Sequence, residues 1–282
     1  MGKTGRWIAR GLIGLGIVAV VAVAGLYGAS EAMIRWPQAK APVHLAAARD
    51  PGAVARGAHV AKVFGCHDCH GADLTGRMFF DEMPLARVAG PNLSRLMVHQ
   101  SDEDLARAIR TGVAADGRSL WIMPSDAFAN LTDAETADLI AYLRTFPAKG
   151  QPQPAKAVGP VGRIGVLLGQ FRSSAANLKA QAGAGLPDLG PQYAQGRSLA
   201  RACVECHGPD LKGSAMVKSP DLTIAGAYDP GDFERLMRTG IAAGNRKLGL
   251  MSETAPTRFP AFSHEEVMAL HAYLRERAQR AS

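Results

Sequence analysis

Two copies of one five-residue pattern constrain this chain more than any other feature. Both are Cys-x-x-Cys-His motifs, at residues 66–70 and 203–207, and together they use all four cysteines of the 282-residue chain. A longer string, Cys-His-Gly-x-Asp-Leu-x-Gly, recurs at residues 69–76 and 206–213. The repetition indicates that the two halves of the chain carry the same kind of site.

The spacing within each motif suits covalent attachment of haem c. Two thiols separated by two residues can add to the two vinyl groups on one porphyrin edge, and the histidine that follows then lies on one ring face, where it can ligate iron. Two filled sites would make a dihaem carrier of single electrons. The residues predicted to form them are Cys66, Cys69, His70, Cys203, Cys206 and His207.

Other chemistry also uses paired cysteines. Two Cys-x-x-Cys pairs could form thioredoxin-like redox centres, structural disulfides or one zinc site. The recurrence of the longer string, and a methionine downstream of each copy, favour haem.

The N-terminus has the pattern of a membrane segment. Lys3, Arg6 and Arg10 precede an uncharged run from Gly11 to Ser30, about 30 Å as a helix, which matches the apolar thickness of a bilayer. The run is longer than the apolar part of a signal peptide, so we expect an uncleaved anchor, although residues 22–24 (Ala-Val-Ala) resemble a cleavage site. The preceding basic residues place the N-terminus in the cytoplasm. We therefore expect a single-pass protein of the bacterial inner membrane with its haem domains in the periplasm.

Charge is distributed unevenly along four expected segments: an anchor with its juxtamembrane stretch (1–42), a first domain (43–147), a linker (148–189) and a second domain (190–282). The chain has a net charge of +7, but the four segments carry +4, −3, +4 and +2 in that order. The basic excess thus lies in the anchor and linker, which suits anionic lipid and gives no basic face for nucleic acid.

The two halves repeat further signals in the same order. A proline follows each haem motif, a methionine lies 11 residues after each Arg-Thr-Gly, and each half ends in a helix that begins with a capping box. The paired features are Pro91 and Pro220, residues 110–112 and 238–240, Met123 and Met251, and residues 132–135 and 263–266. Apolar residues recur at helical spacing, as at Leu105, Ala108 and Ile109, and no strand pattern is evident. The expected fold is therefore all-α. The first half has eight extra residues before its proline, among them Met78-Phe79-Phe80.

The linker is expected to be largely irregular, because it contains Gln-Pro-Gln-Pro at residues 151–154 and small residues throughout. Residues 164–168, with Phe171, are too apolar for a free linker. They could pack against a domain of the same chain, or contact the membrane or a partner subunit.

Taken together, each half resembles the small helical (class I) cytochrome c family, over residues 55–147 and 194–279. The resemblance implies that His70 and His207 are proximal iron ligands and that Met123 and Met251 are distal ones. It further implies that the carbonyls of Pro91 and Pro220 accept a hydrogen bond from the proximal imidazoles, which fixes the ring orientation. Ser252 stands where the family has proline after the methionine.

Other residues compete for these roles. Alternative methionine ligands are Met78, Met83, Met97, Met216, Met237 and Met268, and His59, His99, His264 and His271 could give bis-histidine sites, although we expect these histidines at the surface. Arg110 and Arg238 could pair with haem propionates or simply complement the last turn of a helix.

The expected function is electron transfer as a subunit of a larger redox complex, and therefore as part of a hetero-oligomer. The whole chain looks like the membrane-anchored dihaem cytochromes c that serve alcohol- or gluconate-type dehydrogenases or terminal oxidases; a quinol-oxidising complex is another possible partner. The alternative is a dihaem peroxidase-like enzyme, which needs an open iron position. A redox sensor is a weaker third option, since no signalling domain is evident.

Overall fold

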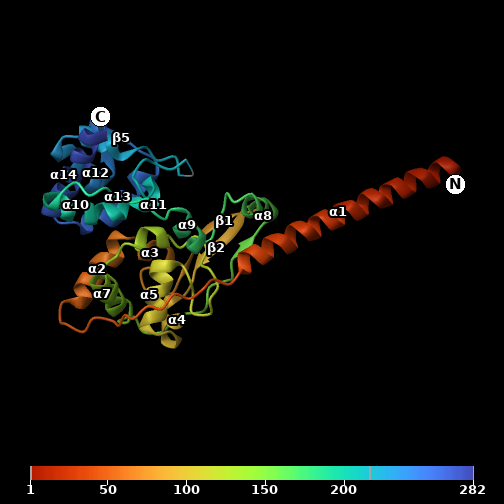
Figure 1. Cartoon of the computed structure of the whole chain (residues 1–282), viewed down its shortest axis with the longest axis horizontal. Helices are drawn as coiled ribbons and strands as arrows, with labels where there is room; N and C mark the ends of the chain where they lie inside the picture. The colour runs from red at the N-terminus through yellow and green to blue at the C-terminus, as the bar shows by residue number, and fades with distance from the viewer. Residues whose placement is uncertain (1, 216, 282) are drawn as a thin grey trace.

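The computed structural model describes residues 2–215 and 217–281. Helix α1 (Lys3–Arg35) projects as a single rod from two helical bodies, with the N-terminus at its far end (Figure 1). Residues Thr4–Arg35 are long and apolar enough to cross a membrane, by length and composition, and none of their most apolar stretch is buried in the protein. The helix is therefore consistent with a membrane anchor or a signal sequence.

The first body contains the first haem motif within a set of short helices. They are α2 (Ala53–Val63), α3 (Cys66–His70), α4 (Leu93–Leu96), η1 (Met97–His99), α5 (Asp102–Thr111), α6 (Ser125–Phe128) and α7 (Asp133–Leu143). The predicted capping box is confirmed at the start of α7, where Thr132 and Glu135 bond each other's backbone N–H. A second box, Ser101 with Asp104, begins α5.

The second body repeats this order. Its elements are η2 (Pro191–Tyr193), α10 (Ala194–Ala200), η3 (Arg201–Cys203), α11 (Val204–His207), η4 (Leu222–Ala227), α12 (Pro230–Thr239), η5 (Ala243–Asn245), α13 (Leu250–Arg258), η6 (Phe259–Ala261) and α14 (His264–Ala281). The capping box predicted here is confirmed too, because Ser263 Oγ accepts from the N–H of Glu266 and Glu266 accepts from the N–H of Ser263.

Both bodies pack their first helix against their last at a glycine. A Cβ on Gly57 of α2 would lie 2.0 Å from the carbonyl oxygen of Asp138 in α7, and a Cβ on Gly196 of α10 would lie 2.1 Å from that of Ala269 in α14. Only glycine allows this approach of two backbones. One cluster of buried apolar side chains extends through both bodies.

The structure is mostly helical, as predicted, but the expectation of no strands was wrong. The extra residues of the first half form a hairpin, β1 (Arg77–Glu82) with β2 (Ala86–Gly90), and the linker adds β3 (Ala157–Val158) to its edge. A short pair, β4 (Ile241–Ala242) with β5 (Arg246–Lys247), lies in the second half. The hairpin leaves no clean alternation in the sequence, because β1 is exposed or half-buried throughout and its register slips between Met78 and Phe80.

The linker is more ordered than its composition predicted. After β3, helix α8 (Pro160–Leu167) packs against α1, and α9 (Ser174–Ala180) packs against α5 and α6. Val166 of the apolar run is buried, whereas Ile164 and Leu168 are 47% and 67% exposed. The run therefore packs against this same chain on one side and keeps an apolar face outward.

Candidate haem-binding sites

The first attachment motif forms its own short helix, α3, between two glycines with positive φ, Gly65 and Gly71. His70 is buried, and its Nδ1 lies 3.1 Å from the carbonyl oxygen of Pro91. A carbonyl can only accept, so Nδ1 carries the proton and Nε2 keeps a free lone pair for a metal. The end of β2, directly before Pro91, packs closely against α3. A Cβ on Gly90 would lie 2.0 Å from the carbonyl oxygen of Cys69.

The second motif reproduces this geometry. His207 Nδ1 lies 2.9 Å from the carbonyl oxygen of Pro220, and the N–H of Gly213 donates to the His207 carbonyl at 2.8 Å. The matching bond in the first half runs from Gly76 to His70 at 2.7 Å. In both halves, one proline carbonyl orients the imidazole and a glycine turn fixes the end of the helix.

The four cysteines are free and half-buried. Burial raises the pKa of Cys66 and of Cys203 to about 12 and that of Cys69 to about 11, and it also raises the pKa of Cys206. Zinc ligands and redox-active cysteines are thiolates. Within residues 2–215 and 217–281, no group of three or more His, Cys, Asp or Glu side chains could hold a metal ion on its own.

Burial also lowers the pKa of His70 and His207, in each case against the opposing effect of the proline carbonyl. Both imidazoles are therefore neutral at neutral pH, which is the form that ligates iron. Paired thiols and an oriented neutral imidazole, repeated in each half, fit the attachment of haem c.

Met123 lies on a loop that two other parts of the chain hold in place. Its carbonyl accepts from Ser125 N–H at 2.8 Å and from Ser174 Oγ, at the start of α9, at 2.6 Å. Two residues earlier, Trp121 Nε1 donates to the carbonyl of Ile34 near the end of α1. The Met123 side chain is half-buried against the hydrophobic core.

Met251 occupies the first turn of α13 and is also half-buried against the core. The neighbouring Ser252, which replaces the family's proline, has a local role. Its Oγ donates to the Gly240 carbonyl at 2.5 Å and accepts from Leu248 N–H at 2.8 Å. The serine thus ties the methionine turn to the glycine that ends α12.

Arg110 and Arg238 have partners within the chain. Arg110 pairs with Asp133 at the start of α7, at 2.5 Å, and Arg238 donates to the Phe262 carbonyl at 2.5 Å and pairs with Glu234 at 3.3 Å. These contacts favour a role in joining the middle and last helices of each domain.

The competing ligands fall in several environments. Met97 and Met237 are core residues, Met268 is half-buried on α14, and Met78 and Met83 lie on the exposed hairpin. Met216 lies outside the described residues. His99 and His264 are exposed, and His59 is half-buried 3.4 Å from Glu266.

His271 corrects the expectation of a surface residue. It is 2% exposed and stacks on Phe233 with ring centroids 4.5 Å apart. Its position on α14 gave no sign of this in the sequence, because burial here depends on which face of the helix meets α12.

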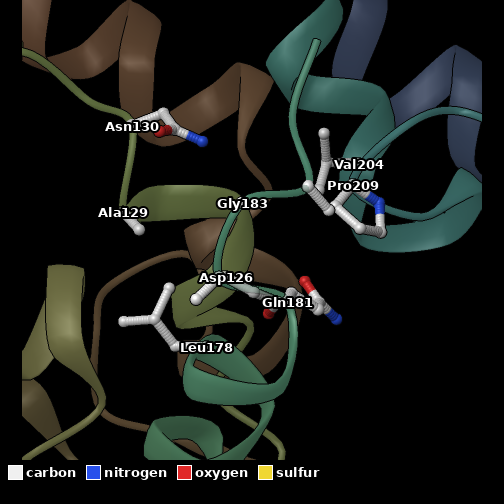
Figure 2. Close-up of a pocket in the computed structure, with 10 residues that line it drawn as sticks. Asp126, Ala129, Asn130, Leu178, Gln181, Gly183, Val204 and Pro209 are labelled. Carbon is white, nitrogen blue, oxygen red and sulfur yellow. The ribbon is translucent and has the colours of Figure 1, made fainter.

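A small cavity marks where the first domain, the linker and the second domain meet. It has a volume of about 180 Å³ and lies between α6, α9 and α11 (Figure 2). Asp126, three residues after Met123, and Val204, between Cys203 and Cys206, both line it. The methionine side of the first site therefore approaches the attachment helix of the second.

Sequence reasoning missed the long-range contacts of the attachment helices. Within the first domain, His67 Nε2 lies 3.1 Å from Tyr142 Oη of α7. Arg258 of α13 reaches both attachment helices. Such contacts depend on packing between distant segments, so the five-residue motif contains no signal for them.

Comparison with known proteins agrees with this geometry. A family model described as cytochrome c matches residues 54–147 and 193–278. The fructose dehydrogenase cytochrome subunit of Gluconobacter japonicus is 25% identical over 253 residues, which cover 79% of this chain and 52% of that protein. The chain thus spans about half the length of this relative.

Proposed function

Because this chain belongs to the cytochrome c family and has two such domains, each with a haem c attachment motif, we propose that it is a membrane-anchored carrier of single electrons for a partner dehydrogenase. The observation that carries the proposal is the repeated site, in which a proline carbonyl orients each motif histidine at 3.1 and 2.9 Å.

We propose the following roles for the site residues. The cysteine pairs would hold the two haems by thioether bonds, and His70 and His207 would ligate the irons through Nε2. Met123 and Met251 would supply a second ligand to each iron. The carbonyls of Pro91 and Pro220 are proposed to fix the tautomer and orientation of the imidazoles. Each haem iron, when bound, supplies one-electron oxidation and reduction.

Helix α1 is proposed to be the membrane anchor, with its N-terminus in the cytoplasm and both haem domains in the periplasm. Basic residues precede its apolar stretch. Its other end is fastened to the linker, since Arg163 of α8 pairs with Glu31 at 2.8 Å and donates to Ser30 Oγ at 2.9 Å. The first domain thus lies next to the C-terminal end of α1, where the proposed anchor would leave the membrane (Figure 1).

The proposed partner follows from the relative, whose name makes it the cytochrome subunit of a dehydrogenase. We propose that this partner oxidises the organic substrate and that this chain receives the resulting electrons. The proposed complex is a hetero-oligomer in which this chain is the electron outlet.

Co-purification tests this proposal. Native membranes containing the tagged full chain are dissolved in mild detergent, and the proteins that accompany it are identified by mass spectrometry. We expect a dehydrogenase subunit, and reduction of both haems when its substrate is added. A complex that contains only a terminal oxidase, or haems that the dehydrogenase substrate leaves oxidised, would contradict the proposal.

A further inference from the structure

One arginine joins the two attachment motifs. Arg258 is the last residue of α13, seven residues after Met251, and its side chain is 10% exposed. Its Nε donates to Asp68 Oδ2 and its Nη1 donates to Glu205 Oε2, both at 2.6 Å.

The two carboxylates occupy the same place in the repeat. Asp68 and Glu205 are each the third residue of their Cys-x-x-Cys-His motif, directly before the second cysteine. Asp68 belongs to α3 of the first domain and Glu205 to α11 of the second. A single guanidinium group therefore binds both attachment helices, through N–H donors on two edges of its plane.

The guanidinium is also packed against the backbone of the first motif. Gly65 directly precedes Cys66 and has a φ of 68°, and a Cβ at this position would lie 2.3 Å from the Arg258 Nε and Cζ atoms. Any larger residue would displace the arginine. The contact thus depends on shape as well as on charge.

Charge holds Arg258 in place. Burial opposes its ionisation, but the Glu205 and Asp68 carboxylates outweigh that effect and raise its pKa, so it stays positive. Without it, two carboxylates would face each other across a partly buried contact, with 41% and 30% of their side chains exposed.

Resting on the proposed function, we propose that Arg258 is a positioning residue that fixes the two haem-attachment helices against each other and so sets the rate of electron exchange between the two haems. The cysteines would bind one edge of each porphyrin, so the helices that Arg258 joins are the ones that would carry the two haems. The exchange moves one electron: one iron goes from Fe(II) to Fe(III) while the other goes from Fe(III) to Fe(II), and no bond is made or broken.

The test compares the full-length dihaem protein with Arg258→Gln and Arg258→Lys, in detergent. The rate of exchange between the haems is measured optically after rapid one-electron reduction, and both potentials are measured by redox titration. Arg275→Gln is the matched control, since Arg275 is an exposed arginine on α14 of the same domain.

We expect Arg258→Gln to slow exchange by about tenfold or more, since it leaves Asp68 and Glu205 facing each other without a cation and so lets the two attachment helices move apart. Haem content and the spectra of the iron ligands should stay unchanged. The exchange rate of Arg258→Lys should lie between those of wild type and Arg258→Gln. Lysine keeps the positive charge but cannot donate to both carboxylates as the planar guanidinium does. Arg275→Gln should leave the rate within about twofold, as expected of a surface change.

Glu205→Gln provides a second route to the same answer if Arg258→Gln fails to load haem. It should slow exchange in the wild-type background, and by a smaller factor in the Arg258→Lys background, because lysine has already lost part of the contact that the two residues share. Exchange within about twofold of wild type in both Arg258→Gln and Glu205→Gln would overturn the role of Arg258 while leaving two working haems and the proposed function intact. A wild-type chain with two haems that do not exchange electrons would overturn both.

Discussion

The carbonyls of Pro91 and Pro220 fix the tautomer and the ring orientation of His70 and His207. Each accepts from Nδ1, which leaves Nε2 unprotonated and fixes the ring plane. With Met123 and Met251 as the proposed second ligands, their neutral and polarisable sulfur atoms would stabilise Fe(II) relative to Fe(III) and give a higher potential than a second imidazole would. The proposed potential of each site therefore depends on one methionine.

Met123→His should keep the haem but lower the potential of one site. We expect a shift of roughly tens of millivolts or more, where about 59 mV corresponds to a tenfold change in a one-electron equilibrium. Redox titration measures it. Met83→His is a suitable control, because Met83 also precedes a proline but is 54% exposed on the hairpin. An unmoved potential in Met123→His would make the ligand assignment wrong.

Met251→Ala should open one iron position in the second domain. Carbon monoxide should then bind to that haem when it is reduced, and not to either haem of the wild-type protein. Absorption spectra under carbon monoxide provide the measurement. Binding to the reduced wild-type protein would instead support the peroxidase-like alternative, which requires an open iron.

At the scale of elements, the linker does more than connect the domains. The start of α9 donates two hydrogen bonds to the loop that carries Met123, from Ser174 N–H to Leu120 and from Ser174 Oγ to Met123. Ser174 is 2% exposed. The linker thus supports the loop that presents the proposed distal ligand.

Ser174→Ala should lower the free energy of unfolding of the first domain by about 1 kcal/mol, since it removes one buried hydrogen bond. The loss of the methionine–iron bond, followed by absorption in increasing denaturant, should move to lower denaturant concentration. Lys179→Ala, at an exposed position of the same helix, should leave the curve unchanged. Equal curves for both variants would show that α9 does not support the loop.

Elements with local chemical signals could be predicted from the sequence, and those that depend on packing could not. The capping boxes at Thr132 and Ser263 are set by residues three positions apart, so their sequence was sufficient. The β1–β2 hairpin has no such signal, because β1 has no buried residue and the hairpin packs against α3 and β3. The fold of the linker likewise depends on α1 and α6, which are distant in the sequence.

At the scale of the whole molecule, the domains meet through charged contacts around a shared apolar core. Besides Arg258, Arg201 of the second domain is 10% exposed and binds Glu135 of the first at 2.5 Å and the carbonyl of Asn130. The haem motifs predicted two sites from the sequence alone. Their mutual placement could not be predicted, because it depends on single long side chains that cross the interface.

Acid should weaken this interface. Burial raises the pKa of Glu135, but Arg201 and the Thr132 cap outweigh it, so the net pKa is below the ordinary value of 4.5. A lowered folded-state pKa contributes stability above the unfolded value, and that contribution is lost as the pH falls through the folded one. The radius of gyration from X-ray scattering should therefore rise below about pH 4.5.

Glu135→Gln provides the control for this pH dependence, because glutamine preserves the helix cap but cannot titrate. It should weaken domain docking at neutral pH and reduce the further change on acidification. A wild-type radius of gyration that stays constant while the carboxylates protonate would contradict a role for Glu135 in docking.

This chain has two haem c sites and is proposed to move single electrons through them. A haem assay combined with a redox titration of the purified full-length protein tests this directly. We expect two haems per chain and two one-electron transitions, each with the spectrum of a six-coordinate His/Met iron. One haem per chain, or a reduced haem that binds carbon monoxide, would contradict it.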